Sequence, residues 1–231
     1  ARSIIVTNTP DVLTDATADL TWALLLATAR RLTEGHQLIQ AGDWTGWDPT
    51  QLLGADVTGQ TLGIIGMGRI GQAVARRAAG FDMTILYASR TSVPPPDSLR
   101  PWQPVAIDTL LRESDFITLH VPLTQDTHHL SGETALRLMR PSAVLINTSR
   151  GPIVDEAALV AALSAGRLAG AGLDVYEEEP KVHPGLLALP QVTTLPHLGS
   201  ATLGTRVRMG MLCVDNVLAA LEGRQAPNRV V

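Results

Sequence analysis

A glycine triplet between an apolar run and a helical pattern is the feature that most restricts the fold of this chain. Gly66, Gly68 and Gly71 form a Gly-x-Gly-x-x-Gly sequence directly after the apolar residues 62–65. Residues 70–79 follow with apolar side chains at helical spacing. A strand, a tight glycine turn and a helix in this order are typical of the first unit of a dinucleotide-binding domain.

Each glycine of the triplet has its own task in such a turn. Gly66 permits the tight turn, Gly68 lets the backbone approach a pyrophosphate, and Gly71 lets the helix pack closely on the strand. The N-terminus of the helix offers unpaired N–H groups and a positive dipole end to a phosphate. A glycine-rich turn without a ligand is the alternative, and the flanking strand and helix argue against it.

Apolar runs alternate with helical segments along the chain. The expected strands cover residues 61–65, 83–87, 116–121, 143–147, 169–174 and 192–195. The expected helices cover residues 15–40, as one long or broken helix with Thr14 or Asp11 as N-cap, and 70–79, 107–112, 132–138, 155–165 and 201–222. This pattern predicts an α/β fold, a doubly wound parallel sheet of Rossmann type with helices on both faces.

The composition limits the class of partner. Hydrophobic residues make up 45% of the 231 residues, which allows one substantial core. The net charge of −4, without a long basic run, argues against nucleic acid or an anionic membrane and favours a small molecule. Because no apolar stretch has the length of a membrane span, we expect a cytoplasmic protein. The single cysteine, Cys213, excludes an intramolecular disulfide and is expected to be a buried thiol.

The end of the second expected strand carries the residues that select the cofactor. An acidic side chain at this position accepts hydrogen bonds from the adenosine ribose and repels a 2′-phosphate. Here the position holds Ser89, Arg90 and Thr91, and the nearest acids, Asp82 and Asp97, lie before the strand and beyond three prolines. We therefore predict NADP(H) rather than NAD(H), with Arg90 pairing with the phosphate and the two hydroxyls assisting. If Arg90 is only a solvated loop charge, NAD(H) is the alternative.

Two residues farther along the chain suit chemistry on a 2-oxo acid. Arg150 has two donors in a fixed planar geometry, which can hold a carboxylate and polarise a ketone. His197 lies in a Pro-His-Leu-Gly-Ser turn just after a strand and can deliver a proton to a nascent alkoxide. A structural arginine is the alternative for Arg150. His120 also follows a strand, but the proline at 122 indicates a cofactor-lining or structural role.

These phrases together resemble the D-isomer-specific 2-hydroxyacid dehydrogenases. The resemblance rests on residues 7–10, the glycine loop 66–71, residues 147–151, Glu179 with Pro180, and Pro196 with His197, and it covers nearly the whole chain. Residues 46–49 and 86–90 most resemble the glyoxylate/hydroxypyruvate reductase branch, which commonly uses NADPH. The resemblance implies an enzyme that reduces glyoxylate or hydroxypyruvate to a D-2-hydroxy acid.

The resemblance also implies the remaining site residues. Glu179 is the carboxylate that favours the imidazolium form of His197 and fixes its ring, while Glu177 and Glu178 are bystanders. The other implied contacts are Arg69 and Ile70 at the pyrophosphate, Thr148, Ser149 and Arg150 at the nicotinamide ribose, Asp174 at the carboxamide, and His197, Leu198, Gly199 and Ser200 around the ring. A solvated three-glutamate loop and a turn-capping Asp174 are the alternatives. No ligand set completes the pair His128 and His129, so no metal is predicted.

The same resemblance implies the domain organisation. Members of the family begin with a substrate-binding lobe that precedes the equivalent of Ala1. We therefore expect residues 10–200 to be the dinucleotide-binding domain and residues 1–9 and 201–231 to be remnants of the substrate domain, with part of the last helix exposed. Such a chain should bind the dinucleotide but turn over poorly, because hydride transfer needs a closed, water-poor cleft. A homodimer with its contact on residues 15–40 is also implied.

Two alternatives to this reductase stay open. A dinucleotide-sensing module, similar to corepressors built on the same scaffold, would bind the cofactor to control assembly. The presence of Arg150, Glu179 and His197 argues against it. Another 2-hydroxyacid dehydrogenase, such as a phosphoglycerate dehydrogenase, is the second alternative, whereas a formate dehydrogenase is expected to have glutamine in place of Glu179.

Overall fold

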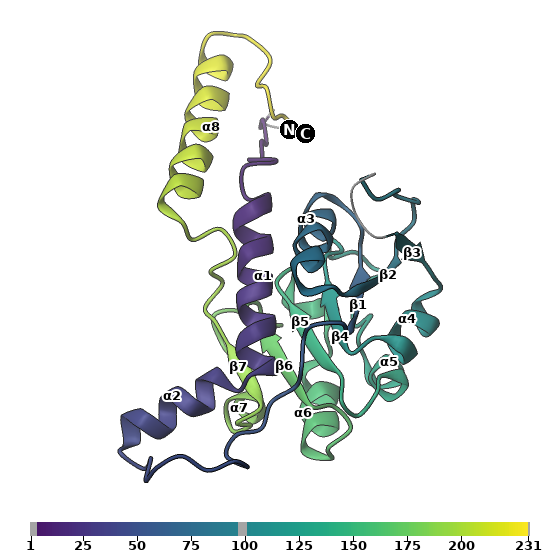
Figure 1. Ribbon diagram of the computed structural model, residues 1–231. Helices are drawn as coiled ribbons and strands as arrows, with labels where there is room; N and C mark the ends of the chain where they lie inside the picture. Colours follow the sequence, from purple (N-terminus) through teal and green to yellow (C-terminus); the bar gives the residue numbers. More distant parts are fainter. Residues whose placement is uncertain (1–3, 97–100, 231) are drawn as a thin grey trace.

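Seven parallel strands form one sheet in the order β3-β2-β1-β4-β5-β6-β7 (Figure 1). In this computed structural model, which describes residues 4–96 and 101–230, the strands are β1 Thr61–Ile65, β2 Thr84–Ala88, β3 Trp102–Pro104, β4 Phe116–Leu119, β5 Val144–Asn147, β6 Gly170–Leu173 and β7 Val192–Thr194. The strand order runs outward in both directions from the neighbours β1 and β4, as in a doubly wound fold. The predicted fold class is confirmed.

Helices cover both faces of this sheet (Figure 1). The helices of the described residues are α1 Thr14–Ala29, α2 Leu32–Ala41, α3 Arg69–Ala78, α4 Ile107–Glu113, α5 Glu133–Leu138, α6 Glu156–Ser164, α7 Pro184–Leu187 and α8 Leu203–Leu221, with short 3-10 turns η1 Ala79–Phe81 and η2 Gly151–Ile153. The helices α1 and α3 pack on one face, and α4, α5 and α6 pack on the other. None of the described helices is long and apolar enough to cross a membrane.

Neighbouring side chains on one strand enter two different cores. In β1, Leu62 and Ile64 join the core beneath α1 and α3, whereas Ile65 joins the core beneath α4, α5 and α6. Both faces are buried, which explains why the strands are continuous apolar runs rather than alternating ones. Gly63 has no room for a side chain, since a Cβ there would lie 2.3 Å from the Ser114 Oγ.

The helical pattern over residues 15–40 forms a broken helix, the second of the two expected forms, as α1 and α2. Arg31 has a φ of 53° between α1 and α2, and this left-handed backbone changes the direction of the chain. Neither expected cap is correct, because Leu13 is the N-cap of α1 and no side chain caps this helix. Thr14 is instead the first helical residue, and the carboxylate of Asp11 pairs with Arg69.

The sequence pattern did not predict the seventh strand, β3, or the short helix α7. The strand β3 has three residues and pairs only with β2 at the edge of the sheet, where Tyr87 lies beside Pro104. Proline is tolerated at an edge because no neighbour needs its N–H. Only Trp102 of β3 is buried, so the strand has no apolar run to detect. The acid Asp97, considered above for the cofactor, lies outside the described residues.

The helix α8 projects away from the sheet and lies beside the start of the chain, so that the two ends meet (Figure 1). The N–H of Asn8 donates to the Asn228 oxygen at 3.1 Å, and the N–H of Val230 donates to the Val6 oxygen at 2.8 Å. The large apolar side chains that α8 exposes are Leu203, Val207, Met211, Val214, Val217, Leu218 and Leu221. Cys213 is exposed with them, so the expectation of a buried thiol is wrong.

Candidate active site

All predicted site residues lie at the carboxyl ends of the strands. The glycine loop follows β1, residues 89–91 follow β2, residues 148–150 follow β5, residues 174–179 follow β6, and residues 197–200 follow β7. The last residues of neighbouring strands lie side by side, because Leu119 pairs with Ile65 and with Asn147. The chemical residues therefore occupy one edge of the sheet, where ligands bind in folds of this type.

A groove of about 510 Å³ runs over the glycine loop. It is lined by the loop, by Ser89, Arg90 and Thr91 at the end of β2, and by residues after β4. A Cβ on Gly66, whose φ is +99°, would lie 2.6 Å from the carbonyl of His120. Above Gly68, by contrast, no described atom lies within 4 Å of an added Cβ. The loop thus has a tight inner side and an open outer side beside the N-terminus of α3, which fits a pyrophosphate.

His120 contributes a buried polar atom to the wall of this groove. Its Nε2 is buried and has no hydrogen-bond partner within residues 4–96 and 101–230. Burial lowers the pKa of His120 to about 3, so the imidazole is neutral at physiological pH. Since buried polar atoms are almost always paired in proteins, this atom also fits a site built for a polar ligand.

Two more residues of the predicted pyrophosphate site flank the groove. Arg69 is exposed and forms an ion pair with Asp11, and both line a smaller hollow of about 290 Å³ next to the groove. Ile70 lines the same hollow and is partly buried against the core beneath α1 and α3. The guanidinium of Arg69 therefore has a carboxylate partner that a phosphate would have to replace.

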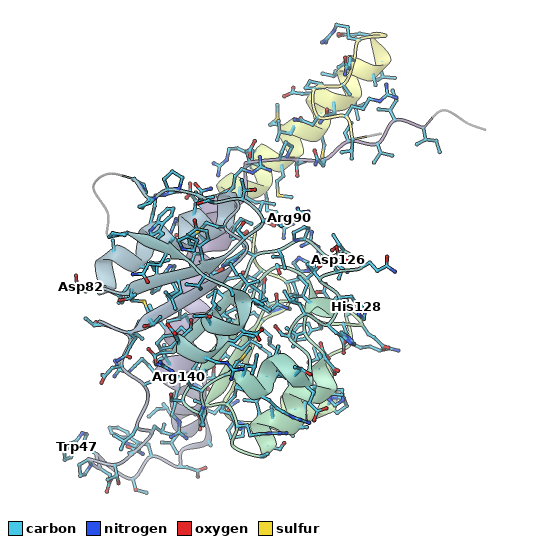
Figure 2. The ribbon with its side chains drawn as sticks, turned by 90° about the vertical axis from the view of Figure 1, so that its right-hand side faces the viewer. Trp47, Asp82, Arg90, Asp126, His128 and Arg140 are labelled. Carbon is cyan, nitrogen blue, oxygen red and sulfur yellow. The ribbon has the colours of Figure 1, made fainter. Side chains whose placement is uncertain are left out.

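The groove also contains an acid that the sequence analysis missed. Arg90 and Asp126 lie at the same side of the domain in Figure 2, and both line the groove. Asp126 follows β4, whereas the sequence analysis looked for acids only around β2. The signal available in the sequence was the place of Asp126 in the loop that follows β4. The groove is thus lined by both a cation and an anion.

The turn after β5 is organised by the buried side chain of Asn147. Its Oδ1 accepts from the N–H of Ser149 at 3.0 Å, and its Nδ2 donates to the Arg150 oxygen at 2.9 Å. Arg150 is exposed, and its Nη1 donates to the Ser149 oxygen at 2.5 Å. A Cβ on Gly151 would lie 1.8 Å from the Tyr176 oxygen, so only glycine lets the two backbones meet here. The turn fixes the backbone of Arg150 while its guanidinium faces solvent.

Hydroxyl groups of α1 hold the turns after β5 and β7. The Oγ1 of Thr21 lies 2.8 Å from the Oγ1 of Thr148, and Thr21 donates to the Thr17 oxygen at 2.8 Å. Thr17 in turn donates to the Gly199 oxygen at 3.1 Å. Thr148 is buried, so its hydroxyl serves the packing of α1 on the sheet.

His197 and Glu179 form the central pair of the site. The Nδ1 of His197 lies 2.8 Å from the Oε2 of Glu179, and the Oε1 of Glu179 accepts from the Tyr176 N–H at 3.1 Å. Partial burial opposes ionisation of Glu179, but the bonds from His197 and Tyr176 and the charge of Arg150 outweigh it and lower the pKa of the carboxyl. An ionised carboxylate only accepts, so the Nδ1 of His197 carries a proton and the ring is held in one orientation.

An apolar hollow of about 280 Å³ adjoins this pair. Its lining residues are Tyr176, Glu179, Pro180, Val182, Thr194, Leu195, Pro196 and His197. The imidazole is 52% exposed and the Glu179 side chain 35% exposed, so both are open to a reactant. Arg150 does not line this hollow, but it lies near enough for its charge to lower the pKa of Glu179.

Asp174 supports the turn that carries His197. Its two oxygens accept from the Leu198 N–H at 2.6 Å and the Gly199 N–H at 2.8 Å, and its side chain is fully buried. Burial raises the pKa of Asp174, although these two N–H groups act against the rise. Asp174 therefore caps this turn, which is the alternative role considered for it in the sequence. Ser200, next to Gly199, is partly buried.

Glu177, which was expected to be a bystander, has side-chain partners of its own. Its Oε1 lies 2.5 Å from the Nε2 of His129, and its Oε2 accepts from the Glu156 N–H at 3.3 Å. Glu178 is exposed, as expected. The rings of His128 and His129 lie 4.0 Å apart, and no described group of three or more His, Cys, Asp or Glu side chains is arranged to hold a metal ion.

A family model matches most of this chain. Residues 22–199 match the description "D-isomer specific 2-hydroxyacid dehydrogenase, NAD binding domain". The match contains the glycine loop, Arg150, Glu179 and His197, and ends directly after the turn that Asp174 caps.

Similar proteins have been named and solved. A glyoxylate reductase of Thermococcus litoralis is 53% identical over 233 residues, which cover 99% of this chain and 70% of the relative. A crystal structure of a Thermus thermophilus protein superposes with a TM-score of 0.93 at 51% identity, over 100% of this chain and 72% of that one. An NADPH-dependent glyoxylate/hydroxypyruvate reductase of Sinorhizobium meliloti, in complex with NADP and malonate, has a TM-score of 0.89 at 41% identity, over 99% and 70% of the two chains.

Proposed function

Since the chain belongs to the D-isomer-specific 2-hydroxyacid dehydrogenases, we propose that it reduces glyoxylate or hydroxypyruvate to the corresponding 2-hydroxy acid, with NADPH as reductant. The observation that carries the proposal is the hydrogen bond of 2.8 Å between His197 and Glu179, at the sheet edge that also holds Arg150. Both named relatives support the substrate class by their names.

Each of these residues has one task in the reaction. The guanidinium of Arg150 binds the substrate carboxylate and polarises its 2-oxo group. Bound NADPH supplies the hydride. The imidazolium of His197 gives its free ring proton to the oxygen that becomes the hydroxyl, and the ionised Glu179 stabilises that imidazolium and keeps the ring in place.

A screen of NADPH oxidation by the full-length protein tests this function. Glyoxylate and hydroxypyruvate should be reduced faster than pyruvate or bulkier 2-oxo acids. The change His197→Ala should lower kcat about 10²–10⁴-fold, because general acid catalysis contributes that much, while NADPH still binds. The exposed His36 of α2 provides the control, since H36A should retain full turnover. A dinucleotide sensor would instead show no reduction, and its assembly would not depend on His197.

The preference for NADPH is tested at Arg90. A guanidinium bound to a 2′-phosphate contributes about 1.5–3 kcal/mol, so Arg90→Ala should lower kcat/KM for NADPH roughly 10- to 100-fold and leave NADH little changed. The exposed Arg112 of α4 is a matched control for the loss of one positive charge. A wild-type preference for NADH would refute this part of the proposal.

The assembly and domain assignments are also proposals. A homodimer through residues 15–40 is supported by exposed apolar side chains on α2, among them Leu32 and Ile39, and sedimentation as a monomer at working concentration would contradict it. We assign residues 10–200 to the dinucleotide-binding domain and residues 1–9 and 201–231 to a substrate domain. The pairing of Val6 with Val230 supports this assignment. Efficient turnover by the 231-residue chain alone would count against it.

A further inference from the structure

The loop after β6 carries two carboxylates with separate partners. Glu179 contacts His197, whereas Glu177 contacts His129 and the start of α6. The contact with α6 is reciprocal, because the Glu177 N–H donates to the Glu156 Oε1 at 2.8 Å while the Glu156 N–H donates to the Glu177 Oε2. Glu177 is therefore bound through both its backbone and its side chain.

We propose that Glu177 is a positioning residue, whose contacts with His129 and Glu156 hold the loop so that the Glu179 carboxylate meets the His197 ring. This inference rests on the proposed function for its catalytic meaning, and on contacts between described residues for its structural content.

The contacts of Glu177 with His129 and Glu156, here called its anchor, lie close to both Glu179 and Arg150. Only one residue separates Glu177 from Glu179, and the Tyr176 N–H just before Glu177 donates to the Glu179 Oε1. On the other side, the backbones of Gly151 and Tyr176 are in direct contact, since a Cβ on Gly151 would overlap the Tyr176 carbonyl. Arg150 precedes Gly151. The anchor thus fixes the loop of Glu179 against the segment that carries Arg150.

His129, the other partner of Glu177, is bonded to the segment that follows Arg150. The His129 N–H donates to the Pro152 oxygen at 2.8 Å, and the Ser131 N–H donates to the Ile153 oxygen at 3.0 Å. Three stretches of chain, around residues 129, 152 and 177, therefore meet at Glu177. A displacement of Glu177 would loosen the turns before and after it.

The carboxylate of Glu177 lies beside a second carboxylate, that of Glu156, and so needs stabilising partners. Its neighbour Glu156 is buried, and burial together with the like charge of Glu177 raises the pKa of Glu156. The N–H group at the start of α6 and the contact with the His129 ring stabilise the Glu177 carboxylate beside this second acid. The other titratable groups near the anchor are Asp155, with an oxygen 3.9 Å from the His129 Nδ1, His183 beside Glu156, and His128, Glu178 and Lys181, which line the same hollow as Glu156 and Glu177.

The direction in which the pKa of Glu179 changes distinguishes the loss of positioning from the loss of one negative charge at Glu177. Removing the negative charge of Glu177 would by itself lower the pKa of Glu179, because like charges disfavour each other. Losing the alignment with His197 and Tyr176 would raise that pKa, because those bonds are what hold it down. Arg150, His197 and Asp174 are the charged groups that face Glu179, and a substitution at Glu177 leaves the charge of each of them in the chain. Displacement of the Arg150 segment would also raise the pKa of Glu179, because the charge of Arg150 helps to lower it.

The experiment compares E177A, E177Q and E178A in the 231-residue chain, with the Glu179 carboxyl carbon followed by NMR during a pH titration and assigned with E179Q. We expect E177A to move the midpoint of Glu179 upward, toward the ordinary value of about 4.3. E177Q retains one acceptor oxygen and should fall between E177A and the wild type. E178A removes an exposed charge from the same loop and should not raise the midpoint.

An unchanged or lowered midpoint in E177A overturns the proposal, and so does an equal rise in E178A. If E177A does not fold, E177Q decides: a midpoint above that of the wild type supports the proposal, and an identical one overturns it. In the full-length enzyme, E177A should lower kcat on the order of 10- to 100-fold, since small misplacements have effects of that size, with KM for NADPH unchanged. The NMR result does not need turnover, so a failure of the proposed function is seen separately as a wild type that reduces no 2-oxo acid.

Discussion

Two buried threonines on the same helix should respond in opposite ways to the same substitution. Thr21 and Thr28 both lie on the buried side of α1, seven residues apart. The hydroxyl of Thr21 bonds to Thr148 and to the Thr17 oxygen, whereas the Oγ1 of Thr28 is buried without a hydrogen-bond partner in the part of the chain that the structure describes. Valine has nearly the same shape and helix propensity as threonine, so each change isolates one hydroxyl.

The expected magnitudes follow from these partners. Because Thr21 donates to Thr17, the hydroxyl of Thr148 must be the donor to Thr21. Thr21→Val leaves that buried donor unpaired, which costs about 1–3 kcal/mol, or roughly 2–12 °C in Tm for a chain of this size. Thr28→Val removes an unpaired buried hydroxyl whose burial is itself unfavourable. It should be neutral or stabilise the fold by up to about 1 kcal/mol.

Differential scanning calorimetry of the wild type, T21V and T28V at one pH measures the difference. The order of Tm should be T21V below the wild type and T28V at or above it. An equal loss in both variants would refute the reasoning, because it would show that the change of shape matters and the hydrogen bond does not.

Two further predictions concern the edge of the sheet. Burial keeps His120 neutral in the folded chain, with a pKa of about 3, while the unfolded chain takes up a proton below about pH 6.5. The folded state therefore loses about 1 kcal/mol between pH 7 and pH 5.5, and H120Q should remove that part of the slope in chemical denaturation; an identical slope would contradict it. Gly151→Ala places a methyl group on the Tyr176 carbonyl and should cost several kcal/mol, on the order of other severe overpacking changes. A variant with wild-type Tm would show that the two backbones separate easily.

Residues that follow from local rules could be predicted from the sequence. The six strands other than β3, the doubly wound class and the glycine loop all come from short-range patterns of apolar residues and glycines, and the structure confirms them. The pairing of His197 with Glu179 came instead from a family resemblance, since nothing in the spacing of 18 residues brings the two together. The roles of the individual site residues stay predictions.

The errors have physical causes in distant contacts. Asp11 was expected as a helix cap, but Arg69, which lies 58 residues along the chain, takes its carboxylate. Glu177 was expected to be a bystander next to Glu179, and the partners that it has come from α6 and from the loop after β4. Cys213 sits in an apolar sequence, yet the surface of α8 around it is open. A local pattern cannot indicate which distant group will arrive at a side chain.

One helix touches both turns of the site, and this has a mechanical consequence. The hydroxyls of Thr17 and Thr21, one helical turn apart on α1, bond to the turn that follows β7 and to the turn that follows β5. A shift of α1 is therefore expected to displace the turn that carries His197 and the turn that carries Arg150 together, so that their separation changes less than if each turn were bonded to a different helix.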